Sequence, residues 1–391
     1  MKKNVQRKML RLPFIILILA LISLSCGNSD NPAIQRGNRA RKNKSEFIKI
    51  AAASPWGQER NLLKQGIEMA KEEINSSGGL LGKQLDIIYF DDDNSMNTGQ
   101  SVAYQIASDE DIIAVLGHSA SSVSISNSLL YHYYGLLMLS PLSTSSRLTT
   151  QGFNMIFRNI PTDSIFGQEA ANLCKEKDWN KVLIYYVDNA YGEALANSFE
   201  LQCSEIDLSV EDRASYTETS PESEYMSIAS LWLRNYDFDA IYLAGVMPQA
   251  GEIISAFRRM GIDEPIIGGD AFDHPLLLST AGEYAEEVYA VTIFDPTTSW
   301  EPYLEFQERF RKSYGEDLDQ AALQGYDAMM VLAEGIRQSD STEPKKIATA
   351  LRQIEEWDGP AGPYRFDVNG DVLNKSVTVK VVKDGIFTKV W

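Results

Sequence analysis

The sequence contains few of the residues that usually hold metal ions. Its 391 residues include three cysteines and three histidines, with neither a CxxC pair nor an HExxH motif. Zinc and related metals are bound mainly by clustered thiolates and imidazoles, so a transition-metal centre is not expected. We expect no metal and no organic cofactor.

Basic residues are too few to balance the acidic ones. The chain has 36 Lys and Arg against 54 Asp and Glu, a net charge of −18. The first 25 residues hold five of the basic residues and no acid, so the remainder has 31 basic and 54 acidic residues, a net charge of −23. Nucleic-acid binding requires a basic face, so it is not expected of this chain.

A long apolar segment is missing from the N-terminal region. The run Phe14–Ile22 is shorter than the roughly 20 apolar residues that a membrane-spanning helix needs. Five basic residues precede it and Leu-Ser-Cys-Gly follows at 24–27, so residues 1–25 are interpreted as an export signal. The four residues resemble a bacterial lipobox, in which Cys26 receives diacylglycerol. An ordinary secretory signal with an incidental cysteine is the alternative, and both place the remaining chain outside the cytoplasm.

Residues 26–45 lack an apolar period and are predicted to be a flexible tether. Their basic side chains either contact anionic lipid headgroups or are simply solvated. These side chains are Arg36, Arg39, Arg41, Lys42 and Lys44.

From Glu46 onward the pattern alternates between strand and helix. Leu63, Ile67, Ala70 and Ile74, for example, fall on one face of a helix. Strands are expected at 47–52, 85–90, 112–116, 136–139, 181–187, 239–245, 265–269 and 289–294, with helices between them and at 299–314, 318–338 and 343–354. The chain should end in a β pair joined at Asp384-Gly385. This pattern predicts parallel sheets with helices on both faces, in two domains.

Two of the predicted strands run directly into serine-rich turns. The strand at 112–116 leads into GHSASS, and the strand at 136–139 leads into SPLSTSS. The first turn also opens a helix, whose free N–H groups favour an anion. Two such turns on neighbouring strands predict a pocket for a small anion such as a carboxylate.

Neither of two apparent catalytic motifs is complete. Gly117–Ser121 approaches the G-x-S-x-G nucleophile elbow but lacks the final glycine that the strained turn needs. GGLLGK at 78–83 resembles a phosphate-binding loop, but Gln84 stands where Ser or Thr would bind magnesium. We therefore expect a binding protein and not an enzyme.

Several segments, in order and spacing, resemble the type I periplasmic binding proteins of the Leu/Ile/Val-binding branch. They include QGIEMAKEEINSSGGLLGKQLDIIYFDDDNS, GHSASSVSISNSLLYHYYGLLMLSPLSTS, FRNIPTD, YYVDNAYGEALA, FRRMGIDEPIIGGD and GPYRFDVNGD. The resemblance implies two doubly wound α/β lobes joined by a three-strand hinge. It assigns 46–159 and 295–358 to lobe 1, and 160–294 and 359–391 to lobe 2.

The resemblance also assigns ligand contacts to the serine turns. It gives Ser121 the ligand α-carboxylate, Leu142 a backbone contact, and Thr144 a hydroxyl contact to carboxylate and amino group. Ser143 or Ser145 replaces Thr144 if the register differs by one residue. Alternatively, Ser121 or Ser122 only caps the helix, and the second turn is hydrogen-bonded without contacting a ligand.

On the opposite lobe, the resemblance points to Tyr191 and Asp270. Tyr191 covers the ligand, and Asp270 pairs with its α-amino group. Relatives have Glu where this chain has the shorter Asp, so the ligand must lie closer or a water must bridge. The structural alternatives are an aromatic at the core edge for Tyr191 and a helix cap or hinge contact for Asp270.

Two departures from the family concern the part of the pocket that selects a ligand side chain. Val246-Met247 replaces an aromatic pair of the relatives, and the loop that carries Trp56 is shorter. Met247 and Trp56 are expected to line the pocket, which then fits a side chain other than Leu, Ile or Val. Two further cysteines, Cys174 and Cys203, either form a disulfide or remain as two buried thiols.

The sequence thus predicts a monomeric, lipid-anchored solute-binding protein. It would capture an amino acid or similar small polar ligand and deliver it to an ABC permease. The alternative is a sensing or envelope-assembly lipoprotein that uses the same clamp without transport. A permease and ATPase encoded beside it would favour transport.

Overall fold

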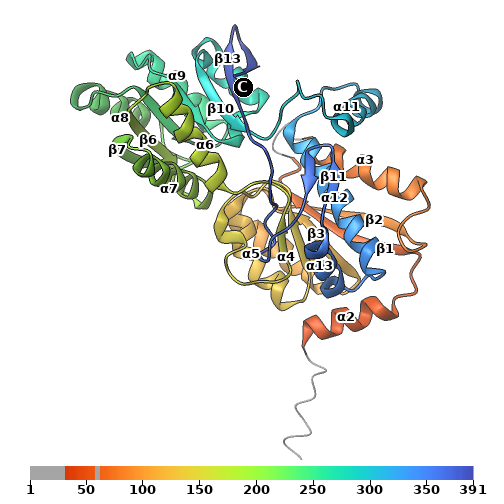
Figure 1. Cartoon of the computed structure of the whole chain (residues 1–391). Coiled ribbons are helices and arrows are strands. Elements are labelled where there is room, and N and C mark those ends of the chain that lie inside the picture. The colour runs from red at the N-terminus through yellow and green to blue at the C-terminus, as the bar shows by residue number, and fades with distance from the viewer. Residues whose placement is uncertain (1–30, 58–61, 391) are drawn as a thin grey trace, which may run out of the picture.

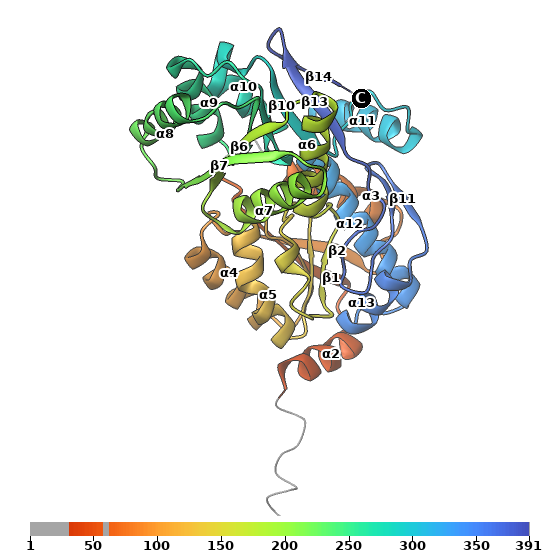
Figure 2. The same cartoon turned by 60° about the vertical axis from the view of Figure 1, so that its left-hand side comes forward.

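The computed structural model describes residues 31–57 and 62–390. The signal peptide predicted at 1–25 and the predicted lipid-attachment residue, Cys26, lie outside this range. The described residues form two α/β lobes, one above the other in Figures 1 and 2. No described helix is both long and apolar enough to cross a membrane. The predicted fold class is confirmed.

Lobe 1 is built on a parallel sheet of order β2-β1-β3-β4-β5. Its strands are β1 (Phe47–Ser54), β2 (Gln84–Asp91), β3 (Ile112–Gly117), β4 (Leu137–Ser140) and β5 (Ile156–Arg158). Its helices are α2 (Pro32–Lys42), α3 (Leu63–Ser76), α4 (Met96–Ser108), α5 (Ser121–Tyr133), α11 (Glu301–Tyr314), α12 (Gln320–Ser339) and α13 (Pro344–Gln353). Every residue of β3 and β4 is buried, as expected for central parallel strands covered on both faces.

Lobe 2 contains a seven-stranded sheet of order β14-β13-β10-β9-β8-β6-β7. Its strands are β6 (Lys181–Val187), β7 (Ser209–Tyr216), β8 (Ala240–Ala244), β9 (Ile266–Gly268), β10 (Val288–Thr292), β13 (Thr378–Lys383) and β14 (Ile386–Lys389). Its main helices are α6 (Asp163–Glu176), α7 (Ala190–Glu205), α8 (Glu222–Asn235), α9 (Gln249–Met260) and α10 (Pro275–Ala281). β13 pairs antiparallel with both β10 and β14, and β13 and β14 form the C-terminal pair.

Glycine allows the chain's late helices to pack closely on lobe 1. A Cβ at Gly66 of α3 would lie 2.0 Å from the Ala322 carbonyl oxygen of α12. Gly325 of α12 approaches the Leu63 carbonyl oxygen in the same way. Segments far apart in sequence therefore form one core.

The third crossing between the lobes lies later in the chain than predicted. Tyr364, Phe366 and Val372 are buried in the lobe 1 core, and a short sheet of β11 (Trp357–Gly359) and β12 (Gly362–Tyr364) precedes them. The chain reaches the lobe 2 sheet only at β13. The predicted assignment of 359–391 to lobe 2 is wrong up to about residue 372, because these apolar side chains fill lobe 1.

The prediction of a flexible tether at 26–45 is wrong for residues 32–42, which form α2. Asn31 caps the helix by accepting hydrogen bonds from the Ala33 and Ile34 N–H groups. The Arg36 side chain is 1% exposed and donates to backbone carbonyls of lobe 1. The acceptors are Tyr134 at 3.0 Å, Asp109 at 2.8 Å, Ala107 at 2.5 Å, and Ile112. Arg36 therefore attaches the segment to the protein and not to a lipid surface.

Both described cysteines are free thiols buried in the lobe 2 core. Cys174 lies on α6 and Cys203 on α7, and neither is bonded to the other. Burial raises the pKa of the Cys203 thiol to about 12 and raises that of Cys174 as well. Of the two alternatives, the structure has the buried thiols.

Candidate functional site

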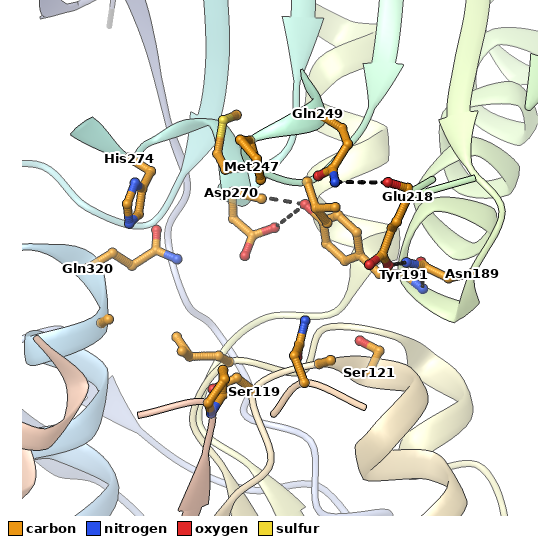
Figure 3. A pocket seen from close by; sticks show the side chains of 18 of the residues that line it. Ser119, Ser121, Asn189, Tyr191, Glu218, Met247, Gln249, Asp270, His274 and Gln320 are labelled. Atoms are coloured by element: carbon orange, nitrogen blue, oxygen red, sulfur yellow. Dashed lines mark hydrogen bonds between the residues drawn. The ribbon is translucent and has the colours of Figure 1, made fainter. Parts of the chain in front are cut away.

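A cavity of about 360 Å³ lies between the lobes, where strands of both sheets end. Figure 3 shows side chains of the two lobes facing each other across it. Lobe 1 contributes Pro55, Asn94, Ser119, Ala120, Ser121, Ser122, Leu142, Asp319, Gln320 and Ala321. Lobe 2 contributes Asn189, Tyr191, Glu218, Val246, Met247, Pro248, Gln249, Asp270, Ala271, Asp273 and His274. Among the described residues, neither Lys nor Arg lines the cavity.

The first serine turn presents the N-terminus of α5 to the cavity. Ala120 occupies the N-cap position, where its methyl side chain cannot accept hydrogen bonds from the free N–H groups. Ser121 and Ser122 follow as the first helical residues, and both line the cavity. The Ser121 hydroxyl accepts a hydrogen bond from the Ser145 N–H at 3.2 Å, which joins the two turns. This helix end is suited to an anion.

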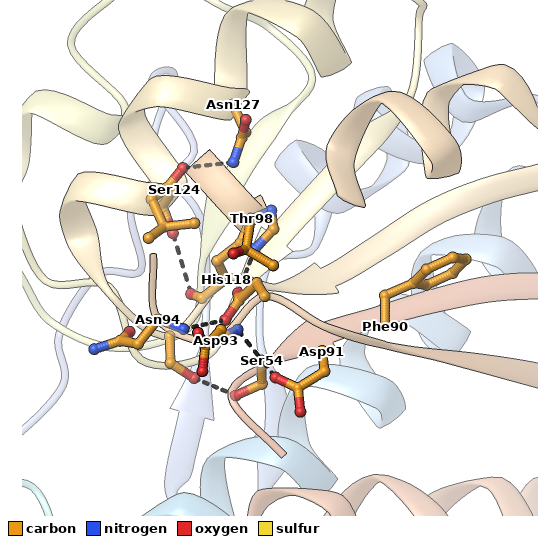
Figure 4. Close-up of polar contacts among 12 residues, drawn as sticks. Ser54, Phe90, Asp91, Asp93, Asn94, Thr98, His118, Ser124 and Asn127 are labelled. Atoms are coloured by element: carbon orange, nitrogen blue, oxygen red, sulfur yellow. Dashed lines mark hydrogen bonds and ion pairs between the residues drawn. The ribbon is translucent and has the colours of Figure 1, made fainter. Parts of the chain in front are cut away.

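Buried hydroxyl groups hold this turn in place through hydrogen bonds to its backbone. The His118 carbonyl oxygen accepts hydrogen bonds from Ser124 at 3.1 Å, Ser140 at 2.9 Å and Ser143 at 3.0 Å. Figure 4 shows the Ser124 hydroxyl directed at His118. Ser143 is fully buried and does not line the cavity, so its predicted ligand contact is wrong. Its hydroxyl is used to hold the turn.

The His118 ring is also structural in this arrangement. Its Nδ1 lies 2.6 Å from Asp92 Oδ2, and its Nε2 lies 2.9 Å from the Tyr131 hydroxyl. Ser119, the serine of the incomplete nucleophile elbow, instead pairs with the Ser54 hydroxyl at 2.6 Å. The imidazole is thus engaged away from Ser119, and the two do not form a nucleophile–base pair.

The second serine turn is shaped by Arg158. Its buried guanidinium donates to the Ser143 and Ser145 carbonyl oxygens at 3.2 and 2.8 Å, and to Asp371 Oδ1 at 2.5 Å. Leu142 lines the cavity. Thr144 is fully buried and absent from the lining, and its carbonyl oxygen accepts from the Asp163 N–H at 2.9 Å. In this structure Thr144 therefore lies behind the cavity wall, contrary to the prediction.

Asp270 and Tyr191 meet on the lobe 2 side of the cavity. The Tyr191 hydroxyl donates to Asp270 Oδ1 at 2.9 Å (Figure 3). Asp270 is 8% exposed, and burial raises the pKa of its carboxyl to about 6. Hydrogen bonds to the carboxylate lower the same pKa. They come from the Tyr191 hydroxyl, the backbone N–H groups of Asp270 and Ala271, and the Gln320 side chain. The carboxylate is thus held at the cavity surface without a basic partner among the described residues.

A second buried cluster connects the lobes beside Asp270. Asp273 forms an ion pair with Lys380, Oδ2 to Nζ 2.8 Å, and both side chains are almost fully buried. The Thr292 hydroxyl lies 2.8 Å from Asp273 Oδ2 and 2.7 Å from Gln320 Oε1. This cluster connects lobe 2 to α12 of lobe 1 at the second crossing between the lobes, where the chain leaves β10 at Thr292 and continues to α11.

The remaining two predicted residues have different positions. Met247 lines the cavity with Val246 and Pro248. Trp56 does not line it: its indole N–H donates to the Phe90 carbonyl at 2.9 Å, and its ring packs edge-on against Tyr89. The prediction for Trp56 is wrong because the indole turns toward β2, and Pro55 lines the cavity instead.

Several lining residues were not found from the sequence. Asn189 lies two positions before Tyr191 and caps α7. Because asparagine is a typical N-cap residue, the sequence could have indicated it. Glu218 lies in the loop after β7, and Gln249 is the first residue of α9, and neither carries such a signal. Gln320 and Asp319 begin α12, and only the packing of α12 on lobe 1 places them at the cavity.

A cleft between two hinged α/β lobes, lined by residues at strand ends, defines a two-lobed solute-binding protein. The chain belongs to the periplasmic binding protein family, whose model matches residues 54–385. Within that family it is similar to the Leu/Ile/Val-binding branch.

Individual relatives agree with this assignment. The chain is 26% identical over 342 residues to a leucine-, isoleucine-, valine-, threonine- and alanine-binding protein of Pseudomonas aeruginosa, covering 86% of this chain and 90% of the relative. An ABC transporter substrate-binding protein of Desulfitobacterium hafniense, solved with Leu, is 32% identical with a TM-score of 0.79, covering 88% and 100%. A leucine-binding protein of Thermotoga maritima is 26% identical with a TM-score of 0.81, covering 88% and 97%.

The family assignment fixes the general function. Its members are solute-binding proteins and not enzymes, and the family implies an extracytoplasmic location. The prediction of a non-enzymatic binding protein is confirmed.

Proposed function

We propose that this protein captures a free α-amino acid between its lobes. The observation that carries the proposal is the placement of opposite electrostatic features across one cavity. The N-terminus of α5, at Ser121 and Ser122, faces it from lobe 1, and the Asp270 carboxylate faces it from lobe 2. A zwitterion matches both, with its carboxylate at the helix end and its ammonium group at Asp270.

The two contacts are strong enough to select the zwitterion. A hydrogen bond to a charged group contributes about 1.5–3 kcal/mol, and the ligand makes such bonds at both ends. Closure of the lobes removes water from the cavity and strengthens these interactions. A ligand with only one of the two charges would leave either the N-terminus of α5 or the Asp270 carboxylate without an oppositely charged partner.

The proposed role includes delivery of the ligand to an ABC permease by a monomer anchored through lipid on Cys26. Relatives described as substrate-binding proteins of ABC transporters support delivery. The lipobox-like Leu-Ser-Cys-Gly at 24–27 supports the anchor.

Calorimetry on refolded, ligand-free protein tests amino-acid capture. We expect saturable 1:1 binding of at least one α-amino acid. If no amino acid releases or absorbs heat while sugars or other uncharged solutes bind, the zwitterion proposal is wrong.

Cell fractionation tests the anchor separately. The wild-type protein should remain with membranes and Cys26→Ser should appear in the soluble fraction. Equal distribution of the two would contradict lipid attachment at Cys26.

A further inference from the structure

The cavity extends beyond the two groups that would hold the common part of an amino acid. On lobe 2, Val246, Met247 and Pro248 form an apolar wall. Asn189, Glu218 and Gln249 form a second, polar wall. Figure 3 shows the Tyr191 ring between Asp270 and the Glu218 side chain. A ligand whose ammonium group lies at Asp270 therefore has a route past apolar residues toward Glu218.

Glu218 is held in position by two helices of lobe 2. The Asn189 side-chain amide donates to Glu218 Oε1 at 3.1 Å, and the Asn189 oxygen is fixed by capping α7. The Gln249 side-chain amide donates to the Glu218 carbonyl oxygen at 3.1 Å. The loop itself is closed by the Thr217 N–H donating to the Ser220 hydroxyl. The carboxylate is thus preorganised at the cavity rim although it is exposed to solvent.

The carboxylates around the cavity differ in whether another group of the protein already pairs with them. Asp273 is paired with Lys380, and Asp319 caps α12 by accepting from the Ala322 N–H at 2.7 Å. Asp270 and Glu218 have no basic partner among the described residues. One ligand ammonium group satisfies Asp270 only, so a second positive charge is needed to match Glu218.

We infer that the ligand is an amino acid with a cationic side chain, and that Glu218 determines this specificity. The inference rests on the proposed capture of an α-amino acid and names its class. Lys and Arg side chains have an apolar stem and a charged end that stays hydrated. The stem fits against Val246, Met247 and Pro248, and the charged end reaches Glu218 at the solvent-exposed rim. A Leu, Ile or Val side chain would leave this carboxylate without a partner.

Matched ligand pairs test the inference by calorimetry on refolded, ligand-free protein. Arginine and citrulline have nearly the same shape and differ in charge, as do lysine and norleucine. We expect the cationic member of each pair to bind more tightly than its neutral partner and than leucine. Added salt should weaken binding of the cationic ligands more than that of the neutral ones.

The Glu218→Gln variant tests the assignment to this residue. It should weaken the cationic ligands by about five- to tenfold, the loss expected for one charge-assisted hydrogen bond at a partly solvated site. Binding of citrulline should be nearly unchanged. Glu205→Gln, which removes an exposed charge at the end of α7 away from the cavity, is the control and should leave all affinities unchanged.

The outcomes separate this inference from the proposed function. If leucine binds as tightly as arginine, or if Glu218→Gln weakens citrulline and arginine equally, the cationic specificity is wrong while amino-acid capture stands. If none of these amino acids binds, the proposed function itself is wrong.

Discussion

At the scale of single residues, Asp270 makes the charge of the cleft depend on pH. Burial raises the pKa of its carboxyl to about 6 in the free protein. A ligand ammonium group beside it favours the ionised form and lowers that pKa. Binding therefore releases a proton near this pH, and affinity increases as the pH rises.

We expect affinity for an amino acid to fall as the pH decreases through about 6, the folded pKa of Asp270. Asp319 also has a pKa raised by burial to about 6, so the wild-type profile alone does not identify the group. Asp270→Asn should bind more weakly and lose most of the pH dependence. Calorimetry across this pH range measures both. An unchanged pH dependence in Asp270→Asn would assign the titration to another group.

The serine turns show how far residue types alone identify a site. From the sequence, Ser121 and Thr144 were the expected ligand contacts, with Ser143 as a substitute for Thr144 if the register differed. Only Ser121 lines the cavity, because the Ser143 hydroxyl and the buried Thr144 are placed by tertiary contacts with His118, Arg158 and Asp163. Hydroxyls are common in turns for structural reasons. The sequence identified the turn, whereas the direction of each side chain depends on residues distant in sequence.

At the scale of elements, α2 was missed for a physical reason. Prediction of a helix relies on a periodic apolar face, and α2 buries only Arg36 and Ala40. Its attachment comes from one guanidinium that bonds carbonyls of four separate residues. Polar docking of this kind has no sequence period. The strongly apolar strands β3, β4, β6 and β8 were predicted, whereas β7, with only intermediate burial along most of its length, was not.

Replacing Arg36 should release α2 from lobe 1. Arg36→Ala removes hydrogen bonds from a charged group, each worth about 1.5–3 kcal/mol, so the docked state should lose most of its stability. Hydrogen exchange followed by mass spectrometry should show rapid exchange across residues 32–42, while the remaining lobe 1 helices stay protected.

Arg39→Ala is the matched control for this element. Arg39 forms an exposed ion pair with Asp111, which is screened by solvent, so its removal should have a much smaller effect. Equal protection of α2 in wild type and Arg36→Ala would show that other contacts hold the helix.

At the scale of the whole molecule, the two lobes carry complementary halves of one site. The helix end at Ser121 and Ser122 belongs to lobe 1, and Asp270 with Tyr191 belongs to lobe 2. Cores of the two lobes are separate, so the lobes can move as units about the three crossings. A zwitterion that contacts both halves favours the closed arrangement, because only that arrangement satisfies both of its charges.

Calorimetry with three related ligands tests this account most directly. The set is the amino acid that binds best, the amine that lacks its carboxylate, and the acid that lacks its amino group. We expect the amino acid to bind at least about tenfold, or 1.4 kcal/mol, more tightly than either analogue. Asp270→Ala should weaken the amino acid by at least about tenfold and leave the acid without an amino group almost unaffected. Equal affinity for all three ligands, or equal loss for both in Asp270→Ala, would contradict zwitterion capture between the lobes.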